Sequence, residues 1–396
     1  MKGGLYFRLQ PAGLIRLPYG SRLFMLPSRL AVGLDKKTGN FRVLEDVYSV
    51  AAFIAPAFTV TCSAAYKETG SPRRLSLFSY AACAFYKGEI YAAAVKTDAR
   101  HFHDPRFINI NEVKKKTKKI KKLFPKNRLV RHLVNCALVY GCPGAQNFFL
   151  GRYEGPLPVS PVCNASCAGC ISYQPGKSCK ASQPRIKFTP TAEEVAEVAL
   201  FHIGRVADPV VSFGQGCEGE PLLRGETIEK SIILIRKRTD KGIINMNTNA
   251  SRPRILERLF DAGLDSIRVS LNSARKEYYL RYYKPKGYGF GDVLESIRIA
   301  KARRKFISVN YLTMPGFTDS ADEFKAFRKF ISSYKIDMVQ WRNLNFDPVR
   351  YFEILKIRAD RANMLGVREI IEALRKQFPR LIMGYYNPSR RMMSGR

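Results

Sequence analysis

The chain has 396 residues, 46% of them hydrophobic and 25% charged, which is enough for two domains with hydrophobic cores. Nine cysteines without a regular framework argue against a secreted scaffold held by disulfides, and we find no leader typical of a signal peptide, so we expect a cytoplasmic protein in a reducing compartment. The formal net charge of +34 favours a polyanionic partner, nucleic acid included.

The first 112 residues have the composition of a small antiparallel β domain. Segments 57–66, 75–86 and 89–96 are rich in aromatic residues, valine and alanine, and Lys87-Gly88 is a two-residue turn signal between the last two. Residues 47–66 form the longest apolar run, but proline, serine and threonine interrupt it. This run therefore predicts buried strands and no membrane span.

Residues 113–154 form a basic segment. Seven lysines lie between Lys114 and Lys122, interrupted only by Thr117 and Ile120. Such a block is typical of a solvated helix or a linker, and it also suits RNA, another polyanion or a membrane surface. No compact RNA-binding signature accompanies the block, so its charge alone does not specify a substrate.

Cys163, Cys167 and Cys170 form a C-x3-C-x2-C triplet. No fourth thiol or histidine stands at a spacing that would complete a zinc site. Structural zinc sites are four-coordinate, whereas an iron–sulfur cluster takes thiolates from a short loop and can leave one iron free. The triplet therefore favours an iron–sulfur cluster with one open iron.

From residue 157 onward, short apolar runs alternate with helical periodicity, as in a parallel α/β barrel. The expected strands span residues 157–162, 209–213, 243–247, 266–271, 306–312 and 336–341. The expected helices span residues 226–238, 253–261, 292–303 and 321–332. Thr189 followed by Pro190 and two glutamates predicts one further helix start. Residues 351–396 are expected to add a C-terminal helix and strand.

Polar motifs follow four of these strands in succession. They are the cysteine triplet, the turn Gly219-Glu220-Pro221, the pair Asn247 and Asn249, and the pair Ser270 and Asn272. Loops at the carboxyl ends of barrel strands share one mouth, so we expect all four motifs to converge. In this order the motifs resemble the radical S-adenosylmethionine (SAM) superfamily over residues 155–350.

The resemblance implies an α/β fold, namely a partial parallel (β/α)6 barrel of the radical SAM type with a smaller N-terminal antiparallel β-rich domain. It implies that Cys163, Cys167 and Cys170 hold a [4Fe-4S] cluster whose fourth iron chelates the amino and carboxylate groups of SAM. The resemblance also implies that Gly219 and Glu220 contact the methionine ammonium and that Pro221 stiffens their turn. It further implies that Asn249, Ser270 and Asn272 face the ribose. Asn310 is implied to face SAM or substrate. Ser270 and Asn272 are also suited to capping the following turn. Gly169 departs from the family, which usually has a bulky or aromatic residue before the third cysteine.

The implied reaction is reductive cleavage of SAM to methionine and a 5′-deoxyadenosyl radical, which abstracts hydrogen from an unreactive carbon. Its electron would come from a donor such as flavodoxin or ferredoxin. The charge favours an anionic, macromolecular substrate, with RNA ahead of a peptide or protein and a small anionic metabolite after both. A tyrosine-rich stretch at residues 278–290 suits either base stacking or packing, and residues 341–345 are placed to face the mouth. The alternative from another class is a basic zinc-containing nucleic-acid-binding protein.

The remaining cysteines and histidines are expected to be structural. Cys217 is the last cysteine, so no cysteine-rich C-terminal extension for auxiliary clusters is expected, and we interpret Cys217 itself as a small buried thiol. We expect no second metal site from Cys136, Cys142 or Cys179. His101 and His103 are interpreted as surface or turn residues.

Overall fold

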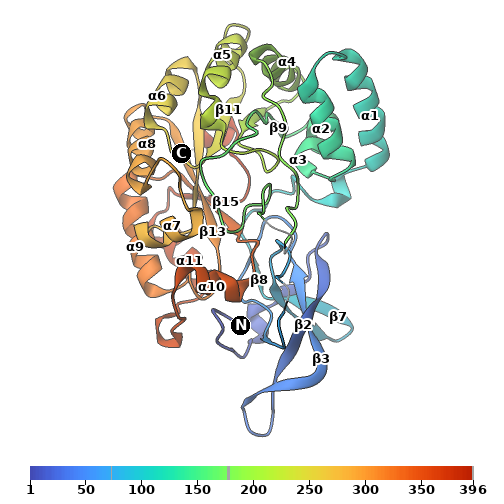
Figure 1. Cartoon of the computed structure of the whole chain (residues 1–396), viewed down its shortest axis with the longest axis vertical. Helices are drawn as coiled ribbons and strands as arrows, with labels where there is room; N and C mark the ends of the chain where they lie inside the picture. Colours follow the sequence, from blue (N-terminus) through green and yellow to red (C-terminus); the bar gives the residue numbers. More distant parts are fainter. Residues whose placement is uncertain (73, 176–178, 395–396) are drawn as a thin grey trace.

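Two large β-sheets organise the chain, an antiparallel one before residue 97 and a parallel one from residue 154 onward (Figure 1). The computed structural model describes residues 1–72, 74–175 and 179–394. Among these residues, no helix combines the length and the apolar character that a bilayer span requires.

The parallel sheet has seven strands in the order β15-β14-β13-β12-β11-β10-β9. They are β9 (Glu154–Pro156), β10 (Val210–Phe213), β11 (Ile243–Thr248), β12 (Ser266–Leu271), β13 (Phe306–Thr313), β14 (Met338–Asn343) and β15 (Ile382–Gly384). Every neighbouring pair is parallel, which confirms the predicted partial barrel. The first strand ends before residue 157, earlier than predicted, and the C-terminal segment supplies a seventh strand.

Helices cover the outer face of this sheet (Figure 1). The helices from residue 192 onward are α4 (Ala192–Ile203), α5 (Gly225–Arg236), α6 (Pro253–Ala262), α7 (Lys276–Tyr283), α8 (Phe290–Ala302), α9 (Ala321–Tyr334), α10 (Pro348–Leu355), α11 (Val367–Gln377) and α12 (Arg390–Ser394). All residues of β10 and β11 are buried, as expected for parallel strands covered on both faces.

The predicted start of α4 was two residues early. Thr191 caps the helix and forms a reciprocal capping box with Glu194. Thr189 instead accepts a hydrogen bond from Arg224 Nε at 2.8 Å. Both threonines precede acidic residues, so the sequence pattern did not separate them.

The antiparallel sheet has the strand order β1-β7-β6-β3-β2-β5 and confirms the β-rich N-terminal domain. Its strands are β1 (Ile15–Arg16), β2 (Arg22–Leu34), β3 (Phe41–Phe53), β5 (Tyr66–Glu68), β6 (Ala81–Tyr86) and β7 (Glu89–Ala92), and β4 (Phe58–Val60) pairs separately with β8 (Ala94–Lys96). Lys87 and Gly88 both have positive φ, at 48° and 79°, as a type I′ hairpin turn requires.

The long β2–β3 hairpin was not predicted. Its outer half extends away from the rest of the domain (Figure 1), and residues 41–48 of β3 are all exposed, with Val47 and Tyr48 at 47% and 48%. The prediction that residues 47–66 are buried throughout was therefore wrong for the first part of that run. In a projecting hairpin neither face of the strands is covered, so apolar residues in its sequence do not predict burial.

Three helices connect the two sheets: α1 (Ile110–Leu123), α2 (Arg128–Leu138) and α3 (Pro143–Leu150). Val113 and Ile120 of α1 and Leu129 of α2 belong to the same hydrophobic core as the barrel strands. The opposite side of α1 is solvent-exposed and is called here the lysine face, which consists of Lys114, Lys115, Lys118, Lys119 and Lys122. The short 3-10 helices are η1 (Pro11–Gly13), η2 (Pro105–Phe107), η3 (Pro221–Arg224) and η4 (Arg361–Asn363).

The β domain contacts the barrel near the carboxyl end of β14. Asn343 accepts a hydrogen bond from the backbone N–H of Val60 at 2.8 Å and donates to the carbonyl of Phe58 at 2.9 Å. Arg29 and Asp347 form an ion pair at 3.3 Å, with both side chains almost fully buried. These contacts bring β-domain residues to the mouth of the barrel.

Candidate active site

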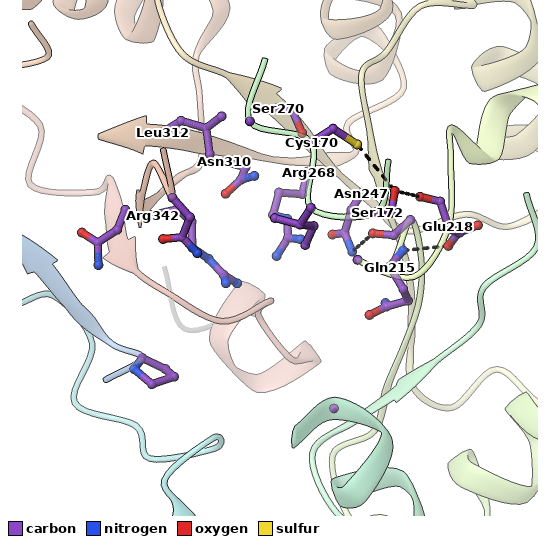
Figure 2. A pocket seen from close by; sticks show the side chains of 18 of the residues that line it. Cys170, Ser172, Gln215, Glu218, Asn247, Arg268, Ser270, Asn310, Leu312 and Arg342 are labelled. Carbon is purple, nitrogen blue, oxygen red and sulfur yellow. Dashed lines mark hydrogen bonds between the residues drawn. The ribbon is translucent and has the colours of Figure 1, made fainter. Parts of the chain in front are cut away.

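A cavity of about 530 Å³ lies at the carboxyl ends of the parallel strands (Figure 2). Its walls come from the cysteine loop, from the loops that follow the barrel strands, and from the β domain through residues 53–56. The volume falls within the roughly 300–1,000 Å³ typical of small-molecule sites.

Cys163, Cys167 and Cys170 all line this cavity. Burial raises the pKa of the Cys163 thiol to about 11. Burial also acts on Cys170, yet hydrogen bonds with Ser172 and Arg185, at 3.5 Å each, leave the pKa of Cys170 below its usual value. The three thiols therefore face one space, and one of them has a cationic neighbour that favours its thiolate.

Backbone hydrogen bonds attach the cysteine loop to α7. The N–H groups of Ser166 and Ala168 donate to the carbonyls of Tyr283 and Tyr282, each at 3.0 Å. Tyr279, Tyr282 and Tyr283 are at most 3% exposed. Burial favours packing for these three tyrosines, and Tyr282 and Tyr283 also line the cavity.

Gly169 has its side-chain position filled by a neighbour. A Cβ atom at this residue would lie 2.8 Å from the hydroxyl of Tyr282. Tyr282 is buried, and its ring packs against Tyr283 and Tyr351. Tyr282 thus occupies space that a larger residue before the third cysteine would need.

The loop after β10 lies against the backbone that leads into the cysteine loop. The N–H of Gly219 donates to the carbonyl of Ser160 at 2.7 Å, and the N–H of Glu220 donates to the carbonyl of Val162 at 2.9 Å. A Cβ at residue 219 would lie 1.9 Å from the Val162 oxygen. Only glycine permits this approach.

The Glu220 carboxylate is occupied by protein donors. It accepts hydrogen bonds from the backbone N–H groups of Leu222 at 3.1 Å and Asn249 at 2.8 Å, and from the Thr248 hydroxyl. Burial raises the pKa of Glu220 to about 7. These bonds join the loop to the end of β11 and fix the backbone at Asn249, while Pro221 begins η3.

Glu218 is a second buried carboxylate that the sequence analysis did not single out. It accepts hydrogen bonds from the N–H groups of Val159 at 2.8 Å, Ser160 at 3.0 Å and Gln215 at 2.7 Å. Burial raises its pKa to about 7. Glu218 thereby holds the segment after β9 against the loop after β10.

Ser270 and Asn310 line the cavity from β12 and β13 (Figure 2). The Oδ1 atom of Asn310 is buried without a hydrogen-bond partner among the described residues. Asn272 lies outside the cavity wall, where its Nδ2 donates to the Tyr278 carbonyl and the Tyr351 hydroxyl at 3.2 Å each. Asn247 and Asn249 complete the set of predicted polar residues in the wall.

Two arginines reach the cavity from strand positions: Arg342, which was expected to face the mouth, and Arg268, which the sequence analysis did not assign to the site. Arg268 of β12 donates to the neutral amide oxygens of Gln340 at 3.0 Å and Asn387 at 3.3 Å, and burial, followed by the charge of Arg342, lowers its pKa to about 9. Arg342 of β14 lies over the Tyr385 ring at 3.8 Å. Within the described part of the chain, the Nε atoms of both arginines lack hydrogen-bond partners.

His103 lies in the same wall. Burial, with further contributions from Arg342 and Arg268, lowers its pKa to about 3, so the imidazole is neutral at pH 7. His103 lies in a turn, as expected, and is partly exposed, while His101 is exposed. Its place in the cavity wall was not predicted. Arg342, Asn343 and Asn345 also line the cavity, as predicted for the end of the sixth strand.

The donor set fits a [4Fe-4S] cluster and SAM. Three thiols from one short loop would supply the cluster ligands and leave one iron for another ligand. The Asn310 oxygen, which has no hydrogen-bond partner among the described residues, and the Ser270 hydroxyl of the neighbouring strand offer polar contacts in the same cavity wall.

Comparisons with known proteins agree with this arrangement. Residues 157–331 match the family model described as the Radical SAM superfamily. The chain is 25% identical over 178 residues to the FeMo cofactor biosynthesis protein NifB of Klebsiella pneumoniae, a match covering 41% of this chain and 38% of that protein. It is 26% identical over 279 residues to an uncharacterized protein of Methanocaldococcus jannaschii, covering 68% of this chain and 83% of that one.

The crystal structure of methylornithine synthase is 15% identical and covers 71% of this chain and 76% of that chain, with a TM-score of 0.41. The matched part of the chain spans less than two fifths of the length of NifB.

Proposed function

Because the chain belongs to the radical SAM superfamily through residues 157–331, we propose that it cleaves SAM at a [4Fe-4S] cluster on Cys163, Cys167 and Cys170 and takes a hydrogen atom from an anionic substrate. When bound and reduced, the cluster and SAM supply the 5′-deoxyadenosyl radical for this step. The chain itself binds, orients and shields the reactants. Flavodoxin or ferredoxin is the proposed kind of electron donor.

The cofactor wall is proposed to consist of the groups that the loops present to the cavity. The backbone around Gly219 faces the methionine ammonium, and Asn249, Ser270 and Asn310 face the remainder of SAM. Glu220 acts as a positioning residue in this proposal, because its carboxylate already accepts three protein hydrogen bonds. Asn272 lies behind the cavity wall in this proposal, where its hydrogen bonds to Tyr278 and Tyr351 connect the end of β12 to α7 and α10.

The observation that supports an anionic substrate is the pair Arg268 and Arg342. Their buried Nε groups lack hydrogen-bond partners within the described residues, and the partners of Arg268 are neutral amides. A phosphate or carboxylate between them would satisfy both donors and offset the burial and the Arg342 repulsion that lower the pKa of Arg268. His103, whose pKa is lowered to about 3 by burial in the protein alone, lines the cavity from the β-domain side.

RNA is the second candidate substrate, and the lysine face of α1 is the observation that favours it. Five exposed lysines on one helix side provide a surface for phosphates. The cavity size restricts this candidate to a nucleotide that leaves the stack and enters alone.

The proposed reaction is tested with anaerobically reconstituted protein, dithionite and SAM. The expected products are methionine and 5′-deoxyadenosine, identified by mass spectrometry. Their absence with a loaded cluster would refute the proposal.

The anion site is tested separately through Trp341, the one tryptophan of the sequence, which precedes Arg342. Titration with inorganic pyrophosphate should change its fluorescence saturably, and Arg268→Gln should weaken binding at least about tenfold. Arg298→Gln is the matched control, because Arg298 pairs with Glu295 on the surface. Equal affinities in all three proteins would contradict an anion site at Arg268.

A further inference from the structure

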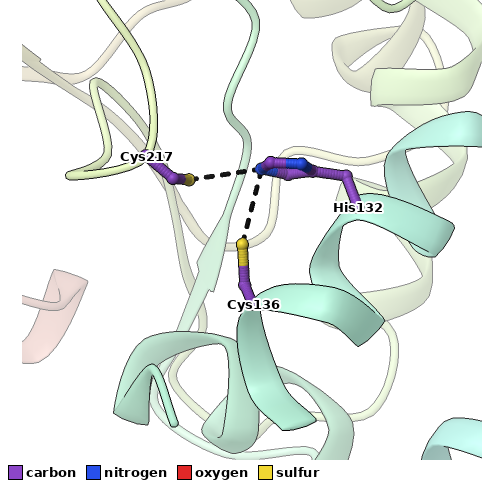
Figure 3. Close-up of side chains that lie close together, drawn as sticks. All are labelled: His132, Cys136 and Cys217. Carbon is purple, nitrogen blue, oxygen red and sulfur yellow. Dashed lines mark hydrogen bonds between the residues drawn. The ribbon is translucent and has the colours of Figure 1, made fainter. Parts of the chain in front are cut away.

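A compact cluster of metal-binding side chains lies outside the cysteine triplet (Figure 3). His132 and Cys136 project from successive turns of α2, and Cys217 approaches from the loop after β10. The three ligand atoms all lie within 4.8 Å of one another. We propose that His132, Cys136 and Cys217 bind one zinc ion.

The distances suit a tetrahedral ion. His132 Nε2 lies 3.4 Å from the sulfur of Cys136 and 3.4 Å from the sulfur of Cys217. With Zn–S bonds of about 2.3 Å and Zn–N bonds of about 2.1 Å, neighbouring ligand atoms of a tetrahedron lie roughly 3.6 Å apart. Small side-chain adjustments therefore admit a zinc ion among the three atoms.

The surroundings favour a neutral zinc–thiolate unit. Cys136 and Cys217 are 1% and 5% exposed, and the Nε2 group of Gln183 donates to the Cys136 sulfur at 3.3 Å. Zinc binding would release one proton from each thiol, so Zn²⁺ and two thiolates carry no net charge in this buried place. Water would supply the fourth ligand, because Cys142 lies outside the group whose ligand atoms fall within 4.8 Å of one another.

The site connects two parts of the molecule. Cys217 directly precedes Glu218, whose carboxylate accepts hydrogen bonds from the backbone before the cysteine triplet. The carbonyl of Cys217 accepts a hydrogen bond from the N–H of Ile186 at 2.7 Å. A bound ion would therefore fix α2 to the loop that forms one cavity wall. The expectation of no second metal site considered Cys136 without His132 or Cys217, which are far from each other in sequence.

The experiment uses the full chain with Cys163, Cys167 and Cys170 replaced by alanine, called here the cluster-free variant. Metal analysis should find one zinc per chain, and cobalt substitution should give the visible bands and sulfur-to-cobalt charge-transfer absorption of a tetrahedral thiolate site. Adding Cys217→Ser should lower zinc affinity at least about tenfold. Adding Cys83→Ser, a thiol of the β domain, should leave the affinity unchanged.

Circular dichroism verifies folding of each protein. If Cys217→Ser fails to fold, the cobalt spectrum of the cluster-free variant decides, because it needs no change at the proposed site. Folded cluster-free protein that binds neither zinc nor cobalt would overturn the proposal, and so would unchanged zinc affinity in folded Cys217→Ser protein. Neither result bears on SAM cleavage by the cysteine triplet.

Discussion

The fit of Gly169 against Tyr282 predicts a strong coupling between these two residues. In Gly169→Ala the new methyl group would lie 2.8 Å from the Tyr282 hydroxyl, inside the 3.4 Å at which ordinary contact begins. The tyrosine cannot retreat easily, because it is 2% exposed and its ring packs against Tyr283 and Tyr351. Overpacking of a core costs about 1–3 kcal/mol.

We therefore expect Gly169→Ala to lower the free energy of unfolding by about 1–3 kcal/mol. Tyr282→Phe alone should cost at most about 1 kcal/mol, because it removes one hydroxyl and leaves the ring packing in place. In the double variant the hydroxyl is absent, so its cost should fall below the sum of the single costs by about 1–3 kcal/mol.

Guanidinium chloride unfolding of the four proteins measures this cycle. Tyr283→Phe is the matched aromatic control, since the Tyr283 hydroxyl has no hydrogen-bond partner within the described residues. Gly291→Ala is the matched glycine control, because its Cβ would meet no atom within 4 Å. Additive costs for Gly169→Ala and Tyr282→Phe would refute the proposed contact.

Three further outcomes are expected. Burial raises the pKa of Glu220 to about 7, so the folded protein holds this proton more tightly than the unfolded chain does. As the pH rises from about 4.5 to 7, the free energy of unfolding should therefore fall, and it should fall less in Glu220→Gln. Equal pH profiles of unfolding for the two proteins would contradict this. Thr191→Ala should cost about 1 kcal/mol in thermal or chemical unfolding through loss of the capping box with Glu194, and a neutral effect would argue against it. If the lysine face binds RNA, replacing all five lysines with glutamine should flatten the salt dependence of RNA affinity without reducing SAM cleavage. Each phosphate contact that is lost should lower the salt slope by roughly 0.7–0.9 counterions. An unaltered slope would mean that the lysine face is solvated and does not bind RNA.

Sequence analysis could predict the parts of the site whose residues lie close together in the sequence. The cysteine triplet lies within eight residues, and each later motif directly follows an apolar strand. Topology then brings them together, because carboxyl ends of parallel strands share one edge. Strand β12 was predicted with its observed bounds, since its flanking turns are clear.

The missed residues depend on long-range contacts. Arg268 lies within strand β12, between Ile267 and Val269. A single arginine inside a strand has no sequence pattern that would assign it to the cavity. His103 belongs to the segment before α1, and only the docking of the β domain brings it to the barrel mouth. His132 and Cys217 are 85 positions apart, so no spacing motif links them.

The central claim is that Cys163, Cys167 and Cys170 hold a [4Fe-4S] cluster that cleaves SAM. The most direct measurement compares iron, acid-labile sulfide and 5′-deoxyadenosine in the reconstituted, reduced chain and in the cluster-free variant. About four irons and four sulfides per chain, with 5′-deoxyadenosine formed from SAM, are expected for the unaltered chain, and none of the three for the variant. Zinc without sulfide in the unaltered chain, or full iron and sulfide in the variant, would contradict the claim.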